Sequence, residues 1–187
     1  MVSKREHLIR TALVLFAKNG FHATGISAIL QAAGLSKKTL YHYFQSKDEL
    51  ILAALQYQDG LFRNQFMRQV AARAETPRDQ ILAIFEVAEE WFLQQSFFGC
   101  IFINAIAEFS SGPAPIRDIS KSYKRLMHGY IVKLCNQLEV QDQVSLADSI
   151  ALLLEGAIVT AQIMEKPDIA KTARKAAAQL IDLAAAP

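Results

Sequence analysis

The sequence predicts an all-α protein of about nine helices. Apolar side chains recur at the three- and four-residue intervals of a helix in nearly every segment, and no segment alternates convincingly with the two-residue period of a strand. Glycines and prolines interrupt this pattern where helices should end or begin, as at Gly20, Gly34 and Pro77. With 52% hydrophobic and 20% charged residues, the 187-residue chain has ample apolar surface for a core and lacks the composition of a disordered protein.

The first three predicted helices have recognisable ends. Gly20 offers a left-handed stop after the first helix, and Thr24 can cap the second, which Gly34 ends. Ser36 can cap the third. The nine predicted helices cover about residues 4–18, 25–33, 37–44, 46–74, 78–95, 99–111, 115–138, 144–164 and 169–185.

The later helices are separated by clearer breaks. Ser46 begins the long fourth helix, and Pro77 stands near the first position of the fifth, where proline is well tolerated. The cluster over residues 110–113 is the clearest turn in the chain and follows an apolar sixth helix. Residues 166–168 separate the eighth helix from an alanine-rich ninth.

Cationic charge is concentrated at the N-terminal end. Residues 1–50 hold seven Lys and Arg against three Asp and Glu, whereas the remainder holds thirteen against fifteen, for a net charge of only +2. A local cationic excess of this kind can meet phosphate groups.

The chain shows no sign of an enzyme. Cys100 and Cys135 are too few and too far apart for a disulfide framework or a C-x-x-C metal site, which favours a reducing, cytoplasmic setting. No phosphate loop, zinc-protease motif, nucleophile elbow or His/Cys/Asp cluster is present. We therefore expect no catalytic residues, no metal and no cofactor.

No leader or membrane segment is expected either. The N-terminal residues are polar and lack the apolar core of a secretory signal. The apolar run over residues 97–107 is too short to span a bilayer, and the run over residues 150–164 is interrupted by Glu155 and Gln162.

Residues 20–50 match a helix-turn-helix. They read GFHATGISAILQAAGLSKKTLYHYFQSKDEL, with two short helices on either side of Gly34-Leu35-Ser36. The glycine permits a positive φ, the leucine fills the angle between the helices, and the serine caps the second one. The third helix of the chain carries cations, hydroxyls and flat rings on its polar side, which suit contact with phosphates and base edges.

This segment resembles the DNA-binding domain of the TetR family of bacterial transcriptional regulators (TetR/AcrR-type repressors). The shared pattern is Gly-Phe, Thr, Ala-Gly-Leu-Ser-Lys, Thr-Leu-Tyr-His-Tyr-Phe, Ser-Lys and Leu. The resemblance implies a DNA-binding domain over residues 1–46 and a helical ligand-binding and dimerisation domain over residues 47–187. Together with the polar side of the third helix, it makes these the candidate DNA-binding residues: Thr24, Ser36, Lys37, Lys38, Thr39, Tyr41, His42, Tyr43 and Lys47.

Two positions depart from the family pattern. Gly25 stands where a second Thr or Ser is usual, and Lys38 stands where Gly or Ala is frequent. Both leave the operator sequence open. For Tyr41, packing with the hydroxyl outward is an alternative to DNA contact.

Large apolar side chains on the fourth to seventh helices could line a pocket for a small apolar or aromatic effector. The alternative is an ordinary core. The run from Phe98 to Asn104, followed by Glu108, resembles one branch of these regulators. The candidate ligand-binding residues are Phe66, Phe85, Phe92, Phe102, Met127 and Tyr130.

The eighth and ninth helices are the expected dimer interface, since the resemblance implies that they pair with their two-fold mates in a four-helix bundle. Burial inside one chain is the alternative. The candidate interface residues are Leu152, Leu153, Gly156, Val159, Ile163, Ala173, Ala177 and Leu180.

The resemblance thus implies a ligand-responsive transcriptional regulator, by family default a repressor. It would bind a palindromic operator in double-stranded DNA as a homodimer and be released by a small-molecule effector. The competing interpretation is a helical module that binds small molecules or proteins without sequence-specific DNA binding, and the basic third helix argues against it. The operator, the regulated genes, the effector, the sign of regulation and any redox role of Cys100 stay open.

Overall fold

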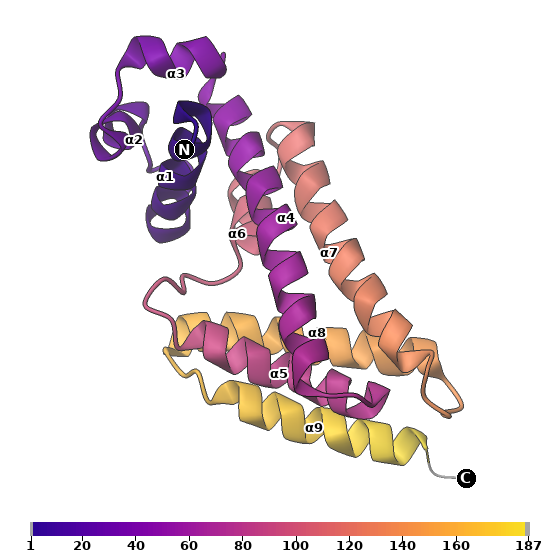
Figure 1. The fold of residues 1–187 in the computed structure, drawn as a ribbon. Helices are drawn as coiled ribbons and strands as arrows, with labels where there is room; N and C mark the ends of the chain where they lie inside the picture. Colours follow the sequence, from indigo (N-terminus) through magenta and orange to yellow (C-terminus); the bar gives the residue numbers. More distant parts are fainter. Residues whose placement is uncertain (1, 186–187) are drawn as a thin grey trace. The chain divides into compact units, whose positions relative to one another are not determined.

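The computed structural model describes residues 2–185, and all of the regular secondary structure within that range is helical (Figure 1). Each helix end lies within three residues of the predicted position, so the all-α class is confirmed. The helices are α1 (Lys4–Asn19), α2 (Ile26–Ala33), α3 (Lys37–Tyr43), α4 (Lys47–Arg73), α5 (Pro77–Phe92), α6 (Ile101–Glu108), α7 (Ala114–Cys135), α8 (Gln143–Met164) and α9 (Ile169–Ala184).

The described residues pack into two compact units. The first comprises the residues up to Phe62 together with Cys100–Tyr123, and the second comprises Arg63–Gly99 and the residues from Lys124 onward. The unit boundaries therefore fall inside α4 and α7 rather than at residue 46. The functional division into residues 1–46 and 47–187 stays a prediction, because compact packing and DNA binding need not share a boundary.

The core of the first unit is built around aromatic rings. Phe16 and Phe21 lie 5.2 Å apart between ring centroids, and Phe21 lies 5.7 Å from the edge-on ring of Phe109. Leu40 on α3 and Phe44 just after it are also buried, so this short helix turns an apolar face inward. A buried apolar side leaves the opposite side of α3 free for polar groups.

The turn between α2 and α3 has the predicted geometry. Gly34 adopts the left-handed conformation, with φ 62° and ψ 32°, so the glycine is required there. The Leu35 N–H donates to the Leu30 carbonyl at 3.1 Å, which closes the C-terminus of α2. Ser36 Oγ then accepts the Thr39 N–H at 3.2 Å and caps α3. These local bonds fix the angle at which α3 leaves the turn.

In the second unit, α9 packs closely against α5 and α8 (Figure 1). Ala173 and Ala177 on α9 are 6% and 0% exposed, so they lie within this packing. Their assignment to the dimer interface stays a prediction, and this packing favours the alternative of burial inside one chain. Alanine suits this position because a small side chain lets neighbouring helices approach closely, which sequence alone cannot distinguish from a dimer contact.

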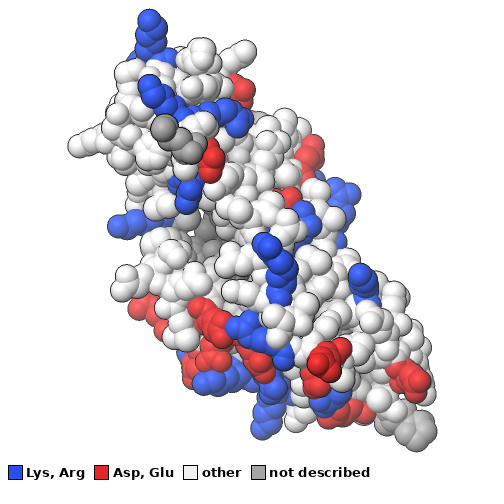
Figure 2. Space-filling model, viewed as in Figure 1, with Lys and Arg blue, Asp and Glu red and all other residues white. Residues whose placement is uncertain are grey.

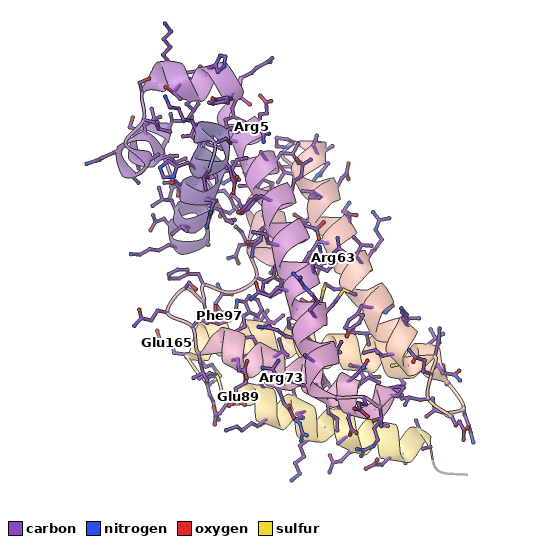
Figure 3. All side chains as sticks on the ribbon, in the orientation of Figure 1. Arg5, Arg63, Arg73, Glu89, Phe97 and Glu165 are labelled. Carbon is purple, nitrogen blue, oxygen red and sulfur yellow. The ribbon has the colours of Figure 1, made fainter. Side chains whose placement is uncertain are left out.

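Ion pairs join the polar sides of α5 and α9. Arg174 Nε lies 2.9 Å from Glu86 Oε1, and Lys171 Nζ lies 3.2 Å from Glu89 Oε1, whose place on α5 is labelled in Figure 3. Figure 2 shows acidic and basic side chains interspersed over these two helices. Since exposed pairs of this kind contribute little each, the apolar face supplies most of the stability of this packing.

By length and composition, α8 is the one described helix that could cross a membrane. Glu155 does not break it, because its carboxylate pairs with Lys124 Nζ at 2.6 Å. Seven residues of α8 between Leu146 and Ala161 are buried, and α5 and α9 pack against the helix. A packed helix of this kind passes the same test as a membrane span, so the test is weak evidence here.

Candidate nucleic-acid interface

The outward side of α3 carries the predicted polar groups. Lys37, Lys38 and His42 are exposed, and the Tyr41 side chain is exposed over 47% of its surface. Figure 2 shows basic side chains over this part of the first unit. This side of α3 therefore combines positive charge with ring and hydrogen-bonding groups that face solvent.

Aromatic contacts hold some of these side chains in place. Lys37 Nζ lies 5.9 Å from the centre of the Tyr41 ring, within the range of a cation–π contact. The rings of His42 and Tyr43 lie 4.8 Å apart at an interplanar angle of 68°. Tyr43 is half-buried, so it supports His42 more than it offers a surface of its own.

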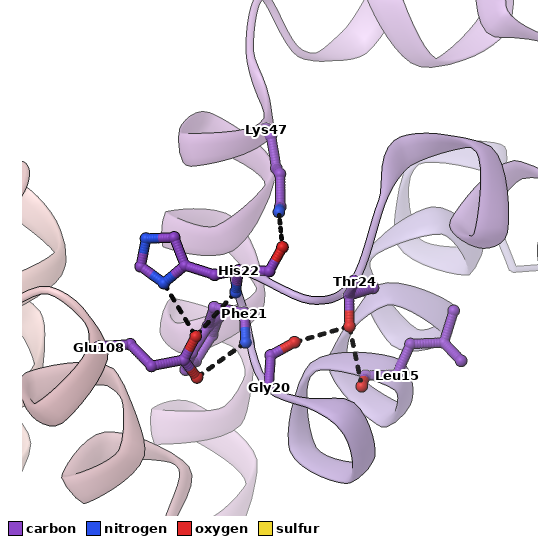
Figure 4. Close-up of polar contacts among 7 residues, drawn as sticks. All are labelled: Leu15, Gly20, Phe21, His22, Thr24, Lys47 and Glu108. Atoms are coloured by element: carbon purple, nitrogen blue, oxygen red, sulfur yellow. Dashed lines mark hydrogen bonds and ion pairs between the residues drawn. The ribbon is translucent and has the colours of Figure 1, made fainter.

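Lys47 begins α4, and its side chain points to the loop between α1 and α2. Its Nζ donates a hydrogen bond to the His22 carbonyl at 3.2 Å, and the side chain is half-buried (Figure 4). An ammonium group has three donors, so one bond to the backbone leaves two for a phosphate. The sequence placed Lys47 correctly but did not reveal its contact with His22.

The N-termini of α2 and α4 differ. At α4, Ser46 Oγ accepts the Glu49 N–H at 3.1 Å, and Glu49 Oε2 accepts the N–H of Gln45, the residue before the cap, at 2.6 Å, so the arrangement resembles a capping box shifted by one residue. At α2, the N-cap residue Gly25 provides no side-chain hydrogen bond. The capping carboxylate makes the start of α4 a poor anion site, whereas the start of α2 keeps its positive end uncapped by any side chain.

Thr24 does not face outward as predicted. Its side chain is 2% exposed, and its Oγ1 lies 2.6 Å from the Gly20 carbonyl and 3.2 Å from the Leu15 carbonyl, to either of which it can donate (Figure 4). Nor does it cap α2, whose N-cap is Gly25. The hydroxyl satisfies buried carbonyls at the end of α1 instead, because a buried polar group must find a partner.

Sequence reasoning missed the role of Glu108. Its carboxylate accepts the Phe21 N–H at 2.9 Å and the His22 N–H at 2.7 Å, and it lies 2.9 Å from His22 Nδ1 (Figure 4). One signal was available: a carboxylate in the last turn of a helix is disfavoured by the helix dipole, so Glu108 at the end of α6 needs a partner elsewhere.

These contacts determine the protonation of Glu108. Partial burial by itself raises the pKa of a carboxyl group, but the hydrogen bonds from the backbone N–H groups of His22 and Phe21 and from the His22 ring outweigh it. The pKa of Glu108 therefore lies below its ordinary value of 4.5, and the group is a carboxylate at neutral pH.

Five of the six candidate ligand-binding residues are buried, and the sixth, Tyr130, is half-buried. Phe66, Phe85, Phe92, Phe102 and Met127 are all less than 8% exposed, and burial raises the pKa of Tyr130. Phe102 stacks on Tyr123 with ring centroids 3.9 Å apart, and it belongs to the first unit, whereas the other five belong to the second.

An open groove of about 260 Å³ lies at the start of α8 and the end of α9, and none of the six lines it. The assignment of these six residues to an effector site remains a prediction.

Some of the candidate dimer residues on α8 are exposed to solvent. Leu152 and Ile163 are each 74% exposed, and a side chain added at Gly156 would meet open space. Leu153 and Val159 are half-buried, as is Leu180 on α9. Leu152, Gly156, Val159 and Ile163 follow the spacing of a single helix face, which is therefore apolar and open.

Neither cysteine is set up to react. Cys100 and Cys135 are both buried, and burial raises the pKa of the Cys135 thiol to about 11. Within residues 2–185, no three His, Cys, Asp or Glu side chains gather in a group that could hold a metal ion.

Comparison with known proteins finds similarity to bacterial regulatory proteins. The family described as "Bacterial regulatory proteins, tetR family" matches residues 8–54, which include α2, α3 and the start of α4. The HTH-type transcriptional repressor NemR of Escherichia coli is 29% identical over 140 residues, which cover 72% of this chain and 67% of NemR. The uncharacterised HTH-type transcriptional regulator YerO of Bacillus subtilis is 38% identical over 82 residues, which cover 44% of this chain but only 28% of YerO.

Solved structures share the whole fold. A TetR-family transcriptional regulator from Streptomyces coelicolor superposes with a TM-score of 0.88 at 24% identity, over 98% of this chain and 96% of that chain. A second transcriptional regulator, from Streptomyces avermitilis, superposes with a TM-score of 0.85 at 27% identity, over 98% of both chains. The similarity therefore extends beyond the helix-turn-helix to all nine helices of the described residues.

Proposed function

We propose that the chain is a ligand-responsive transcriptional regulator of the tetR type, which binds a palindromic DNA operator as a homodimer and leaves it when a small molecule binds. Its operator, its subunit arrangement and its effector belong to the proposal. The relative NemR is named a repressor, and we propose the same sign of regulation, exerted on DNA in the cytoplasm.

The outward side of α3 is the observation that carries the proposal. The exposed Lys37 and Lys38 supply the charge that phosphates attract, while Thr39, Tyr41 and His42 supply groups that can meet base edges. Ser36 caps this helix and is exposed beside it, and Lys47 retains donors for a flanking phosphate. Tyr43 acts in support, through its contact with His42.

Dimer formation is supported by the open apolar face of α8. Leu152, Gly156, Val159 and Ile163 would meet their two-fold copies, because a symmetric dimer needs a self-complementary patch. A glycine within the patch lets another helix approach closely. One α3 reads only a few base pairs, and two copies about 34–36 Å apart, or a multiple of that distance, would read a palindrome.

The effector is proposed to be a small apolar or aromatic molecule. Four of the six candidates, Phe66, Phe85, Phe92 and Met127, are buried in the second unit, among the apolar surroundings that such ligands prefer. Binding would release DNA if the ligand favoured a conformation with the wrong spacing between the two α3 helices.

Selection of bound duplexes from a random DNA pool tests the proposal. We expect enrichment of one palindromic site, with affinity that falls steeply as salt rises. Recovery of no common site, or retention of random and selected DNA with equal affinity, would contradict it. Variants of α3 with Lys37 and Lys38 changed to Ala should lose this enrichment, whereas Lys133→Ala, an exposed change on α7, should retain it.

A further inference from the structure

Glu108 makes a set of contacts that no DNA-facing residue shares. It lies at the end of α6, 86 residues from His22 along the chain, and its two carboxylate oxygens accept both backbone N–H groups at Phe21 and His22. All of these residues belong to the first compact unit. A carboxylate that accepts two adjacent backbone N–H groups fixes the peptide between them in both position and orientation.

The surroundings are shaped for this contact. Gly20 has φ +85°, and a Cβ there would lie 3.0 Å from Glu108 Oε1, so glycine leaves room for the carboxylate to approach the backbone. The neighbouring residue Phe109 packs its ring 5.7 Å from that of Phe21 and 4.7 Å from that of His22. Apolar contacts and charge-assisted hydrogen bonds thus hold the same two residues.

The fixed segment in turn holds Lys47. The His22 residue that donates its N–H to Glu108 accepts a hydrogen bond from Lys47 Nζ through its carbonyl at 3.2 Å. Figure 4 shows that Glu108, His22 and Lys47 are joined in this order by hydrogen bonds. This hydrogen bond restrains the ammonium group of Lys47 near the start of α4 and limits the number of rotamers that the side chain can adopt.

We propose that Glu108 is a positioning residue for DNA binding: it fixes the His22 backbone, and His22 holds Lys47 where it meets a phosphate. This inference rests on the proposed function. Glu108 itself does not touch DNA, and its negative charge would oppose binding if it acted only through the electrostatic field of the protein.

Two opposing effects make the test sharp. Glu108→Gln and Glu108→Ala each remove a negative charge, which by electrostatics alone strengthens binding to any DNA. Loss of positioning instead weakens binding to a duplex selected from the random pool, by about tenfold, the scale of one charge-assisted hydrogen bond. Glu139→Gln is the matched control, because it removes the same charge from an exposed residue of the second unit and should leave affinity unchanged or slightly raised.

A double-mutant cycle separates positioning from a purely structural role. Glu108→Ala should weaken binding to the selected duplex about tenfold when Lys47 is present, but less than about twofold in a Lys47→Ala background. A structural role would give the same loss in both backgrounds and would overturn the inference. Glu108→Gln retains one acceptor oxygen, so its affinity for the selected duplex should lie between those of Glu108→Ala and the wild type.

Amide hydrogen exchange provides a readout that needs no DNA. The N–H groups of Phe21 and His22 should exchange faster in Glu108→Ala, while that of Leu8 in the core of α1 keeps its rate. Failure to select any duplex would overturn both the proposed function and this role. Selection of a duplex that Glu108→Ala binds as tightly as wild type would overturn this role alone.

Discussion

Ser36 Oγ lies 2.9 Å from Thr39 Oγ1 and also accepts the Thr39 N–H at 3.2 Å, so one hydroxyl both caps α3 and touches the side chain of a proposed base-reading residue. The recognition helix has only seven residues, from Lys37 to Tyr43. A helix that short depends on its cap and on tertiary packing, because isolated short helices are unstable.

Substitution of Ser36 should separate stability from DNA binding. Ser36→Ala should lower the free energy of unfolding by about 1 kcal/mol, the usual value of an N-cap, as measured by urea denaturation. Ser36→Asp retains a capping oxygen and should keep stability near wild type, yet it should bind DNA less tightly because its charge repels phosphate. Equal DNA affinity for Ser36→Asp and wild type would place this cap away from the duplex.

Substitution of Lys47 should change the overall affinity for DNA, whereas substitution of the outward residues of α3 should change the base preference. Lys47→Ala should weaken binding to all sequences and reduce the slope of log affinity against log salt by about one, as expected for a phosphate contact. Thr39→Ala and His42→Ala should instead alter the base preference recovered by selection from a random pool. Equal losses on selected and random DNA for all three variants would contradict these roles.

The tight packing of α9 predicts an asymmetry between neighbouring alanines. Ala177 is fully buried, so Ala177→Leu should overpack the contact of α9 with α5 and α8 and cost about 1–3 kcal/mol of unfolding free energy. Ala176 is half-buried, and Ala176→Leu should cost less. Thermal and chemical denaturation measure both. A stable Ala177→Leu protein with altered subunit association would assign Ala177 to the dimer interface.

The open face of α8 predicts where dimers can be disrupted. Leu152→Asp should weaken dimer association at least about tenfold, because it places a charge within the proposed apolar patch. Val14→Asp changes a side chain that is 61% exposed on α1 and serves as the control. Sedimentation over a range of concentrations compares the two. If both variants associate as the wild type does, α8 is not the interface.

Acid should weaken the first unit through Glu108. A group whose pKa is lower in the folded state than in the unfolded state stabilises the fold fully above its ordinary pKa and loses this contribution as pH falls through the folded value. Because the pKa of Glu108 is lowered from 4.5, its contribution should decline as pH falls below about 4.5. Unfolding free energy measured against pH should therefore fall less steeply in Glu108→Gln than in wild type. Matching slopes in the two proteins would refute the assignment.

Local signals in the chain located the recognition helix well. Gly34 at positive φ and Ser36 as N-cap each follow from short-range chemistry, and the structure has them as predicted. A helix end depends on a few consecutive residues, so its position can be read from them. The outward direction of Lys37 and Lys38 follows from the same periodicity.

Long-range partners could not be predicted in this way. Thr24 has a polar side chain and Ala177 a small one, and residues of either kind occur both at the surface and in the interior. In this protein both are buried. Thr24 is buried because two carbonyls of the first unit lie beside it, and Ala177 because α5 and α8 pack against α9. Glu108 carried a signal, an acid at the wrong end of a helix, but nothing in the chain indicated that its partner would be the backbone of Phe21 and His22.

By itself the sequence determined the helices, their ends, the basic side of α3 and the resemblance to a family of regulators, because helix periodicity, caps and contiguous motifs are properties of neighbouring residues. Only the tertiary structure decided which of the candidate polar and small residues remain at the surface, and which carboxylate holds the segment that orients Lys47. The physical reason is that burial and pairing depend on what the folded chain brings together across many residues, and local sequence does not encode the identity of those partners.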